Sequence, residues 1–209
     1  SVLTSFCLTI ALSGPALPRP LPLVQEKLPY VLLLDMASHM NLSDIMPTRW
    51  QCAIYKARDF SHSIKGSPQA LVAFSKAAFV VCPLTLDQKS LDHLLSVLNP
   101  SLMPEDGYDL ALALKKAGQV LTQAHFQSGH ILLLTAGRPD AKSYKEAKLL
   151  ANKGMHVSVL AMGTLDNTPV KNQQGHFVFQ KNGSIVTTAL YPDAYAKLAA
   201  SGQGNWAMF

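Results

Sequence analysis

The sequence is poor in cysteine and in charged residues, and both shortages exclude whole classes of protein. Three cysteines among 209 residues are too few for a disulfide framework, and none belongs to a Cys-x-x-Cys or Cys/His cluster that could hold structural zinc. Charged residues make up 15% of the chain and hydrophobic residues 48%, which indicates a globular rather than a disordered protein. We expect Cys52 and Cys82 to be buried free thiols.

A basic cluster is also missing, although the formal net charge is +5. Lys115 and Lys116 are the only adjacent basic pair, and no basic stretch is interleaved with aromatic residues. Proteins that bind nucleic acids gather their positive charge on one face or along one helix. The scattered charge therefore argues against nucleic acid as a partner.

No apolar run is long enough for a complete membrane span, which needs about 20 residues. Residues 2–12 are apolar and uncharged, and prolines follow from Pro15 onward. The run also lacks the basic region that begins a signal peptide. We predict that residues 1–14 are the end of a transmembrane helix or a membrane tether and that residues 15–29 form a stiff, proline-rich spacer. A short buried apolar segment is the alternative for the first run.

Strand and helix signals alternate from residue 30 onward, which predicts a doubly wound, Rossmann-like α/β fold with helices on both faces of the sheet. The continuous apolar run at 30–34 is typical of a parallel strand buried on both faces, and residues 130–134 and 157–161 predict two further strands of the sheet. Residues 69–74 and 78–82 predict a hairpin, so the mostly parallel sheet gains one antiparallel edge strand. Apolar spacing and cap residues predict four helices: from Pro47 to 64, from a Thr85 cap to 98, over 109–124, and from a Ser143 cap to 153.

The last part of the chain, from about residue 170 to 209, differs in character. Asn182-Gly183 is a strong turn signal between two short strands at 177–180 and 185–188, and a helix is expected over 192–200. We interpret residues 30–209 as one domain that includes this hairpin and helix.

The first strand ends in Asp35-Met-Ala37-Ser38-His39, at the place where Asp-x-Ser-x-Ser begins the metal-ion-dependent adhesion site of von Willebrand factor A (VWA) domains. Further segments resemble this family in the same order, most closely the Bat-type (aerotolerance, BatB-like) membrane proteins of bacteria. These segments are Ser43-Asp44-Ile-Met-Pro47-Thr-Arg49, Leu71-Val-Ala-Phe74-Ser75, Val81-Cys-Pro83-Leu84-Thr85, Leu102-Met-Pro104-Glu-Asp-Gly107-Tyr108-Asp109, Gly129-His-Ile-Leu-Leu-Leu134-Thr135-Ala136-Gly137 and the stretch from Gly175 to Trp206.

The resemblance implies a metal site that has lost most of its ligands. In the family, an aspartate, two serines, a threonine and a second aspartate hold one Mg²⁺ or Mn²⁺. The matching positions here are Asp35, Ala37, His39, Tyr108 and Ala136. Hard cations prefer oxygen ligands, whereas an imidazole suits softer metals. We therefore expect a degenerate site without bound metal; a weak Mg²⁺ or Mn²⁺ site is the alternative.

The resemblance also implies a membrane-tethered, non-enzymatic module that binds other proteins at the bacterial inner membrane, with the domain facing the periplasm. The implied partners are sibling Bat-type VWA proteins and a MoxR-type AAA+ ATPase. Ligands of open α/β sheets bind at the carboxyl ends of the strands, so we expect a partner-binding rim there. An enzyme that uses Asp35, His39 and Tyr108 as acid and base is the other alternative, without a nucleophile motif to support it. The predicted rim residues are Asp35, Ser38, His39, Tyr108, Asp109 and Thr135.

Overall fold

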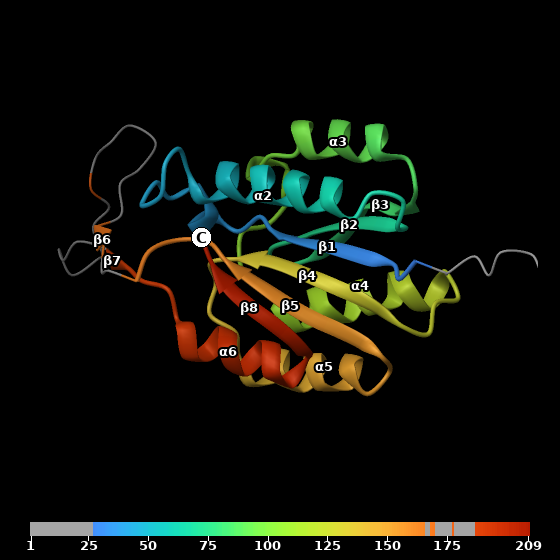
Figure 1. Ribbon diagram of the computed structural model, residues 1–209. Helices are drawn as coiled ribbons and strands as arrows, with labels where there is room; N and C mark the ends of the chain where they lie inside the picture. The colour runs from blue at the N-terminus through green and yellow to red at the C-terminus, as the bar shows by residue number, and fades with distance from the viewer. Residues whose placement is uncertain (1–26, 166–167, 170–176, 178–186) are drawn as a thin grey trace, which may run out of the picture.

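A six-stranded sheet organises the computed structural model, which describes residues 27–165, 168–169, 177 and 187–209. The strand order is β3-β2-β1-β4-β5-β8, and every neighbouring pair is parallel except β2 with β3 (Figure 1). The predicted mostly parallel sheet with one antiparallel edge strand is confirmed. The strands are β1 (Tyr30–Asp35), β2 (Gln69–Phe74), β3 (Ala78–Thr85), β4 (Gly129–Thr135), β5 (Met155–Ala161) and β8 (Gln203–Met208).

Helices cover both faces of the sheet, as the alternation of elements predicts. Figure 1 shows α2 (Arg49–Ser63) and α3 (Gln88–Val97) on one face, packed against each other. The other face carries α4 (Leu110–Gln123), α5 (Ala141–Ala151) and α6 (Pro192–Ser201), which contact one another in that order. The doubly wound α/β fold is therefore confirmed.

The central strand β1 positions the candidate site. Its residues 31–34 have no exposed surface, because β2 and β4 flank the strand and helices cover both of its faces. The register pairs Asp35 with Phe74 on β2 and Leu34 with Leu134 on β4. Parallel strands in register end at one edge of the sheet, so Asp35 and Thr135 come to lie side by side there.

Three helix starts differ from the sequence prediction, and in each case a better cap is the reason. Asp87, not Thr85, caps α3, and its carboxylate accepts from the amides of Lys89 and Ser90. Asp140, not Ser143, caps α5. A carboxylate immediately before a helix accepts from the free N–H groups two or three residues further on, and its negative charge suits the positive end of the helix. The helix expected from Pro47 begins at Arg49, capped by Thr48.

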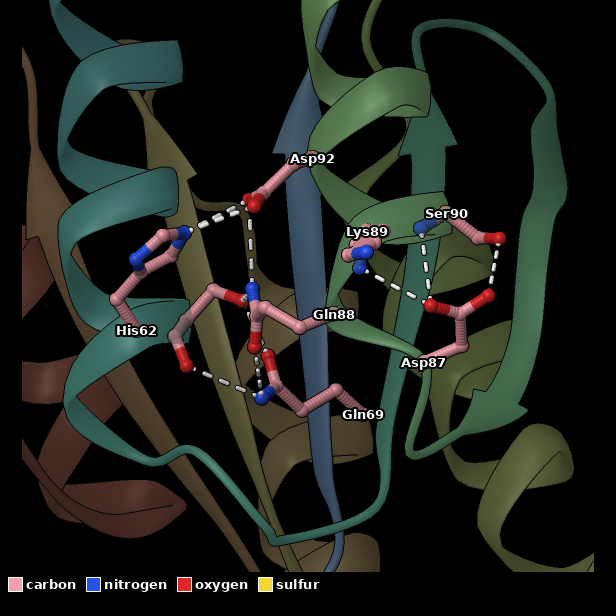
Figure 2. Close-up of polar contacts among 8 residues, drawn as sticks. His62, Gln69, Asp87, Gln88, Lys89, Ser90 and Asp92 are labelled. Atoms are coloured by element: carbon pink, nitrogen blue, oxygen red, sulfur yellow. Dashed lines mark hydrogen bonds and ion pairs between the residues drawn. The ribbon is translucent and has the colours of Figure 1, made fainter.

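A hydrogen-bond network joins α2, α3 and the β2–β3 hairpin at the amino end of β2 (Figure 2). The buried Ser61 hydroxyl donates to Gln69 Oε1 at 2.6 Å and accepts from Gln88 Nε2 at 2.7 Å. Gln88 also donates to Asp92, and the same carboxylate bonds His62 Nε2 at 2.9 Å. Each donor meets an acceptor, so the network fixes the edge hairpin against both helices.

The C-terminal part adds two strands that the sequence analysis did not predict, β6 (Thr168–Pro169) and β8. Helix α6 is confirmed at Pro192–Ser201, and β8 then pairs in parallel with β5. Short strands β6 and β7 (Thr187–Thr188) pair antiparallel. The predicted Asn182-Gly183 turn lies outside the described residues.

The N-terminal predictions fall largely outside the described part of the chain. The tether at 1–14 and all but residues 27–29 of the spacer belong to the segment that is not described. Within the described residues, no helix has both the length and the hydropathy needed to cross a bilayer. Cys52 and Cys82 are confirmed as buried free thiols, and burial raises the pKa of each.

Two histidines lie side by side on the α2 face of the sheet. His130 of β4 and His156 of β5 are register partners with ring centroids 5.4 Å apart, and Tyr30 stacks on His130 at 5.1 Å. The Nδ1 atom of His156 is buried without a hydrogen-bond partner among the described residues. Burial lowers the pKa of His130, and the neighbouring His156 lowers it further.

We predict that this pair makes folding stability fall under mildly acidic conditions. The unfolded chain takes up the His130 proton near pH 6.5, whereas the folded chain does so only at lower pH. The free energy of unfolding therefore falls as the pH drops from 6.5 through the pKa of His130 in the folded chain. Uptake of one proton gives a slope of at most about 1.4 kcal/mol per pH unit, and solvent screening of the charge makes the slope smaller. Urea unfolding at several pH values should show a shallower loss for His130→Gln; an unchanged pH profile would contradict the assignment.

Candidate functional site

The candidate site is a hydrogen-bonded cluster around the buried carboxylate of Asp35. Asp35 has no exposed surface. Its Oδ1 accepts from the amide of Ala37 at 3.0 Å, and its Oδ2 accepts from Thr135 Oγ1 and from His39 Nε2, both at 2.6 Å. Asp35 thus holds the loop after β1 to the end of β4.

Thr135 links this carboxylate to Tyr108. The Thr135 hydroxyl donates its one proton to Asp35, so it accepts at its other contacts, from the Gly137 amide at 3.0 Å and from the Tyr108 hydroxyl at 3.2 Å. The Tyr108 hydroxyl shares its one proton between Thr135 Oγ1 and the Gly137 carbonyl oxygen, to which it donates at 3.3 Å. Burial raises the pKa of Tyr108 well above its usual range, and the nearby Asp35 charge raises it further. Tyr108 is therefore a hydrogen-bond donor at neutral pH.

Aromatic side chains fill the space between the loops. The Tyr108 ring lies so close to Gly137 that a Cβ added there would be 2.3 Å from a ring carbon. The His39 and Tyr108 rings meet edge to face at 5.5 Å. Glycine at 137 is thus required by the close approach of the ring rather than by its own backbone angles.

The structure brings the predicted rim residues together but gives them different roles. Asp35 and Thr135 are fully buried, so a partner could not touch them. Asp109 caps α4, with its carboxylate accepting from the Leu112 amide at 2.9 Å. The groups that reach the surface include His39, whose side chain is 28% exposed, and Ser38.

The sequence analysis missed Asp106, which joins two of the loops. Its Oδ1 accepts from the Ser38 amide at 2.9 Å, across 68 residues of sequence. The hydrogen bonds from Ser38 hold the pKa of Asp106 below its usual value. The only sequence signal was its place in the loop between Met103 and Asp109.

A buried ion pair beside the cluster was also missed. Arg49 donates two hydrogen bonds to Asp44, each 2.7 Å long, and the two side chains are 1% and 2% exposed. The amide and hydroxyl of Thr164 donate to the same carboxylate. Burial alone would raise the pKa of Asp44, but the hydrogen bonds and charge of Arg49 and the Thr164 amide hold it below its usual value. The Asp-x-x-Pro-x-Arg spacing was the available signal for this pair.

The donor set does not fit a hard divalent cation. Both oxygens of Asp35 already accept hydrogen bonds from the protein, and Ala37 and Ala136 offer no side-chain ligand. The His39 and Tyr108 rings lie against this network. Within residues 27–165 and the shorter described stretches, no group of three or more His, Cys, Asp or Glu side chains is placed to share one ion.

Comparison with known sequences decides the family. The sequence profile of the von Willebrand factor type A domain matches residues 30–138, about half of the chain. The chain belongs to the von Willebrand factor type A domain family. The search among curated proteins gave no match.

Solved structures share this VWA fold across most of the chain. BatB from Bacteroides thetaiotaomicron is 23% identical, with a TM-score of 0.79 over 87% of this chain and 90% of that one. An aerotolerance-related membrane protein from Bacteroides fragilis is 22% identical, with the same TM-score over 87% of this chain and 91% of that one. A VWA protein from Catenulispora acidiphila is 16% identical, with a TM-score of 0.63 over 88% of this chain and 39% of that one. At these identities the likeness concerns the fold.

Proposed function

We propose that this VWA domain is a non-enzymatic protein-interaction module that works without a bound divalent cation. The observation that carries the proposal is the closed network around Asp35, in which protein donors take up the carboxylate oxygens that a metal would need. Recognition then rests on the shape and hydrogen bonds of the surrounding loops. The contact surface would include Ser38, His39 and Asp106, with Asp35 and Thr135 holding these loops in place.

Two structural relatives suggest where the module works. One is described as BatB and the other as an aerotolerance-related membrane protein. We propose that this chain is likewise associated with a bacterial inner membrane, with the domain on the periplasmic side. Its partners would be sibling Bat-type VWA proteins and a MoxR-type AAA+ ATPase.

The burial of the cluster argues against an enzyme. A general acid or base must lie within hydrogen-bond reach of its substrate, but Asp35 is fully buried and all three of its contacts are internal. The raised pKa of Tyr108 removes it as a base at neutral pH. The pocket next to the cluster is lined by Ser38 and Asp106, and by none of Asp35, His39 and Tyr108.

The metal-dependent alternative makes a different prediction. A domain that binds Mg²⁺ or Mn²⁺ in its folded state alone is stabilised by that ion. Millimolar metal would then raise the melting temperature of this chain. The metal-free proposal expects no rise.

Photo-crosslinking in the native cells tests the interaction surface. A benzoylphenylalanine at Ser38 is expected to give discrete adducts with another protein, several-fold more than the same residue at Lys153, an exposed position in the turn before β5 at the opposite end of the sheet. Mass spectrometry of the adducts would identify the partner. Equal labelling from both positions, or none from Ser38, would contradict the proposed surface.

A further inference from the structure

A pocket of about 280 Å³ opens beside the Asp35 cluster, between the 3₁₀ helices η1 (Ser38–Asn41) and η2 (Pro100–Leu102). Pockets for small molecules usually measure about 300–1,000 Å³, so this pocket is at the small end of the range and has room for one long side chain. Its walls combine apolar, neutral polar and charged residues. They are Met36, Pro100 and Met103; Ser38, Asn41, Asn99 and Ser101; and Asp106 as the one charged group.

The charge of this pocket comes from Asp106, which has no lysine or arginine partner in the described part of the chain. Asp106 is exposed, and among the described residues no lysine or arginine forms an ion pair with it. The Ser38 hydrogen bonds lower the pKa of Asp106, so the carboxylate stays ionised at neutral pH. One carboxylate oxygen accepts from the Ser38 amide at 2.9 Å, and the group keeps further acceptor positions.

The surrounding loops add to this negative field, although the chain as a whole has a net charge of +5. Two acids are matched by bases, Asp44 by Arg49 and Glu105 by Lys76. Asp109 and Asp140 are used as helix caps, and the remaining base on the neighbouring loop, Arg138, lies over the Tyr191 ring. The edge that would hold a cation in a metal-binding relative is therefore left with an excess of carboxylates.

We propose that this pocket receives a lysine or arginine side chain of the partner protein. This inference rests on the proposed function and names the chemistry of what the module recognises. The buried Met36 and Pro100, with Met103, provide apolar surface for the methylene stem, and long basic side chains pack their stems in this way. The Asp106 carboxylate binds the cationic head, with Ser and Asn oxygens around it. A carboxylate of the partner would instead be repelled by the negative charge of Asp106.

The test uses small probes and amide chemical shifts of the isotopically labelled 209-residue chain. Titration with Nα-acetyl-arginine methylamide and its lysine counterpart is expected to shift the amides of Ser38, Asn41 and Ser101 in a saturable way. Nα-acetyl-glutamate methylamide should leave them in place. The arginine effect should weaken with added salt, because the carboxylate is exposed.

Two matched variants give the control. Asp106→Asn removes the charge and is expected to weaken arginine binding about fivefold, the effect of losing a partly exposed ion pair. Asp109→Asn removes another exposed carboxylate, which does not line the pocket, and should bind as the unaltered chain does. Equal binding by Asp106→Asn, or equal shifts with the glutamate probe, would overturn the inference.

The same variants separate this inference from the proposed function. If Asp106→Asn loses arginine binding and also the Ser38 adducts, the pocket recognises a basic side chain of the partner. If the adducts persist unchanged in Asp106→Asn, the proposed interaction surface is supported, but the proposal that its pocket binds a basic side chain is wrong. If no adducts form from Ser38 in the unaltered chain, the proposed function itself fails, whatever the probes do.

Discussion

Replacing Arg49 with methionine is expected to lower the free energy of unfolding by about 3–5 kcal/mol, the usual cost of removing one member of a buried ion pair. Arg49 and Asp44 are 1% and 2% exposed, so the substitution leaves a carboxylate with little access to water. The Thr164 amide and hydroxyl can satisfy part of that charge but not neutralise it. Urea unfolding followed by circular dichroism at pH 7 measures the loss.

Lys76→Met is the matched control for Arg49→Met. Lys76 and Glu105 also form an ion pair, but their side chains are 63% and 62% exposed, and exposed pairs contribute little. We expect no measurable change in stability. Adding Asp44→Leu to Arg49→Met should recover part of the loss, because the stranded charge is removed with it. If Arg49→Met lowers the free energy of unfolding as little as Lys76→Met does, the Asp44–Arg49 pair does not stabilise the fold.

Asp35→Ala is expected to destabilise the domain by about 3 kcal/mol, and by the same amount with and without divalent metal. The substitution leaves the Ala37 amide and the Thr135 hydroxyl as buried donors without an acceptor, each worth about 1–3 kcal/mol. His39 is partly exposed and can turn to water. The measurement is urea unfolding in millimolar Mg²⁺ and again in EDTA.

Comparing the unfolding in Mg²⁺ with the unfolding in EDTA decides between two roles for Asp35. If Asp35 organises the loops, the unaltered chain has one stability in both solutions, and Asp35→Ala shows one loss. If Asp35 is a metal ligand, Mg²⁺ stabilises the unaltered chain and not the variant. Asp109→Ala provides the control, with an expected cost of about 1 kcal/mol for a lost helix cap in either solution.

Most of the fold could be predicted from the sequence because its signals are local. Continuous apolar runs identified the buried parallel strands, and the short segment between residues 74 and 78 identified the antiparallel hairpin. The clustering of Asp35 with Thr135 followed from the rule that parallel strands end at one edge. These inferences needed the order of elements and no knowledge of contacts.

Strand β8 was missed because its glycine, Gly204, allows a close contact with β5 and does not mark a turn. A Cβ at Gly204 would lie 2.1 Å from the Val157 carbonyl oxygen, and a Cβ at Gly202, the residue before the strand, would lie 2.6 Å from Val157 Cβ. The strand can approach β5 only because these side chains are absent. Gly202-Gln203-Gly204 therefore gave a local signal for a loop where the tertiary structure has a close strand contact.

The missed site residues depend on contacts between distant segments. Asp44 meets Thr164 across 120 residues, and Asp106 meets Ser38 across 68. Spacing along one helix or strand cannot report such pairs. The exposed and buried members of the predicted rim were likewise indistinguishable in sequence, since burial of Asp35 and Thr135 depends on how the loops close over them.

The Asp44–Arg49 pair also shows that the segment matched by the family model depends on residues outside it. The recognisable family segment is residues 30–138, yet the guanidinium of Arg49 packs against Gly163 and its partner carboxylate bonds Thr164. Strands β5 and β8 follow that segment as well. Excised alone, residues 30–138 would expose one side of β4 and uncover the ion pair. The segment that matches the family is therefore smaller than the sheet to which it belongs, which continues through β5 to β8.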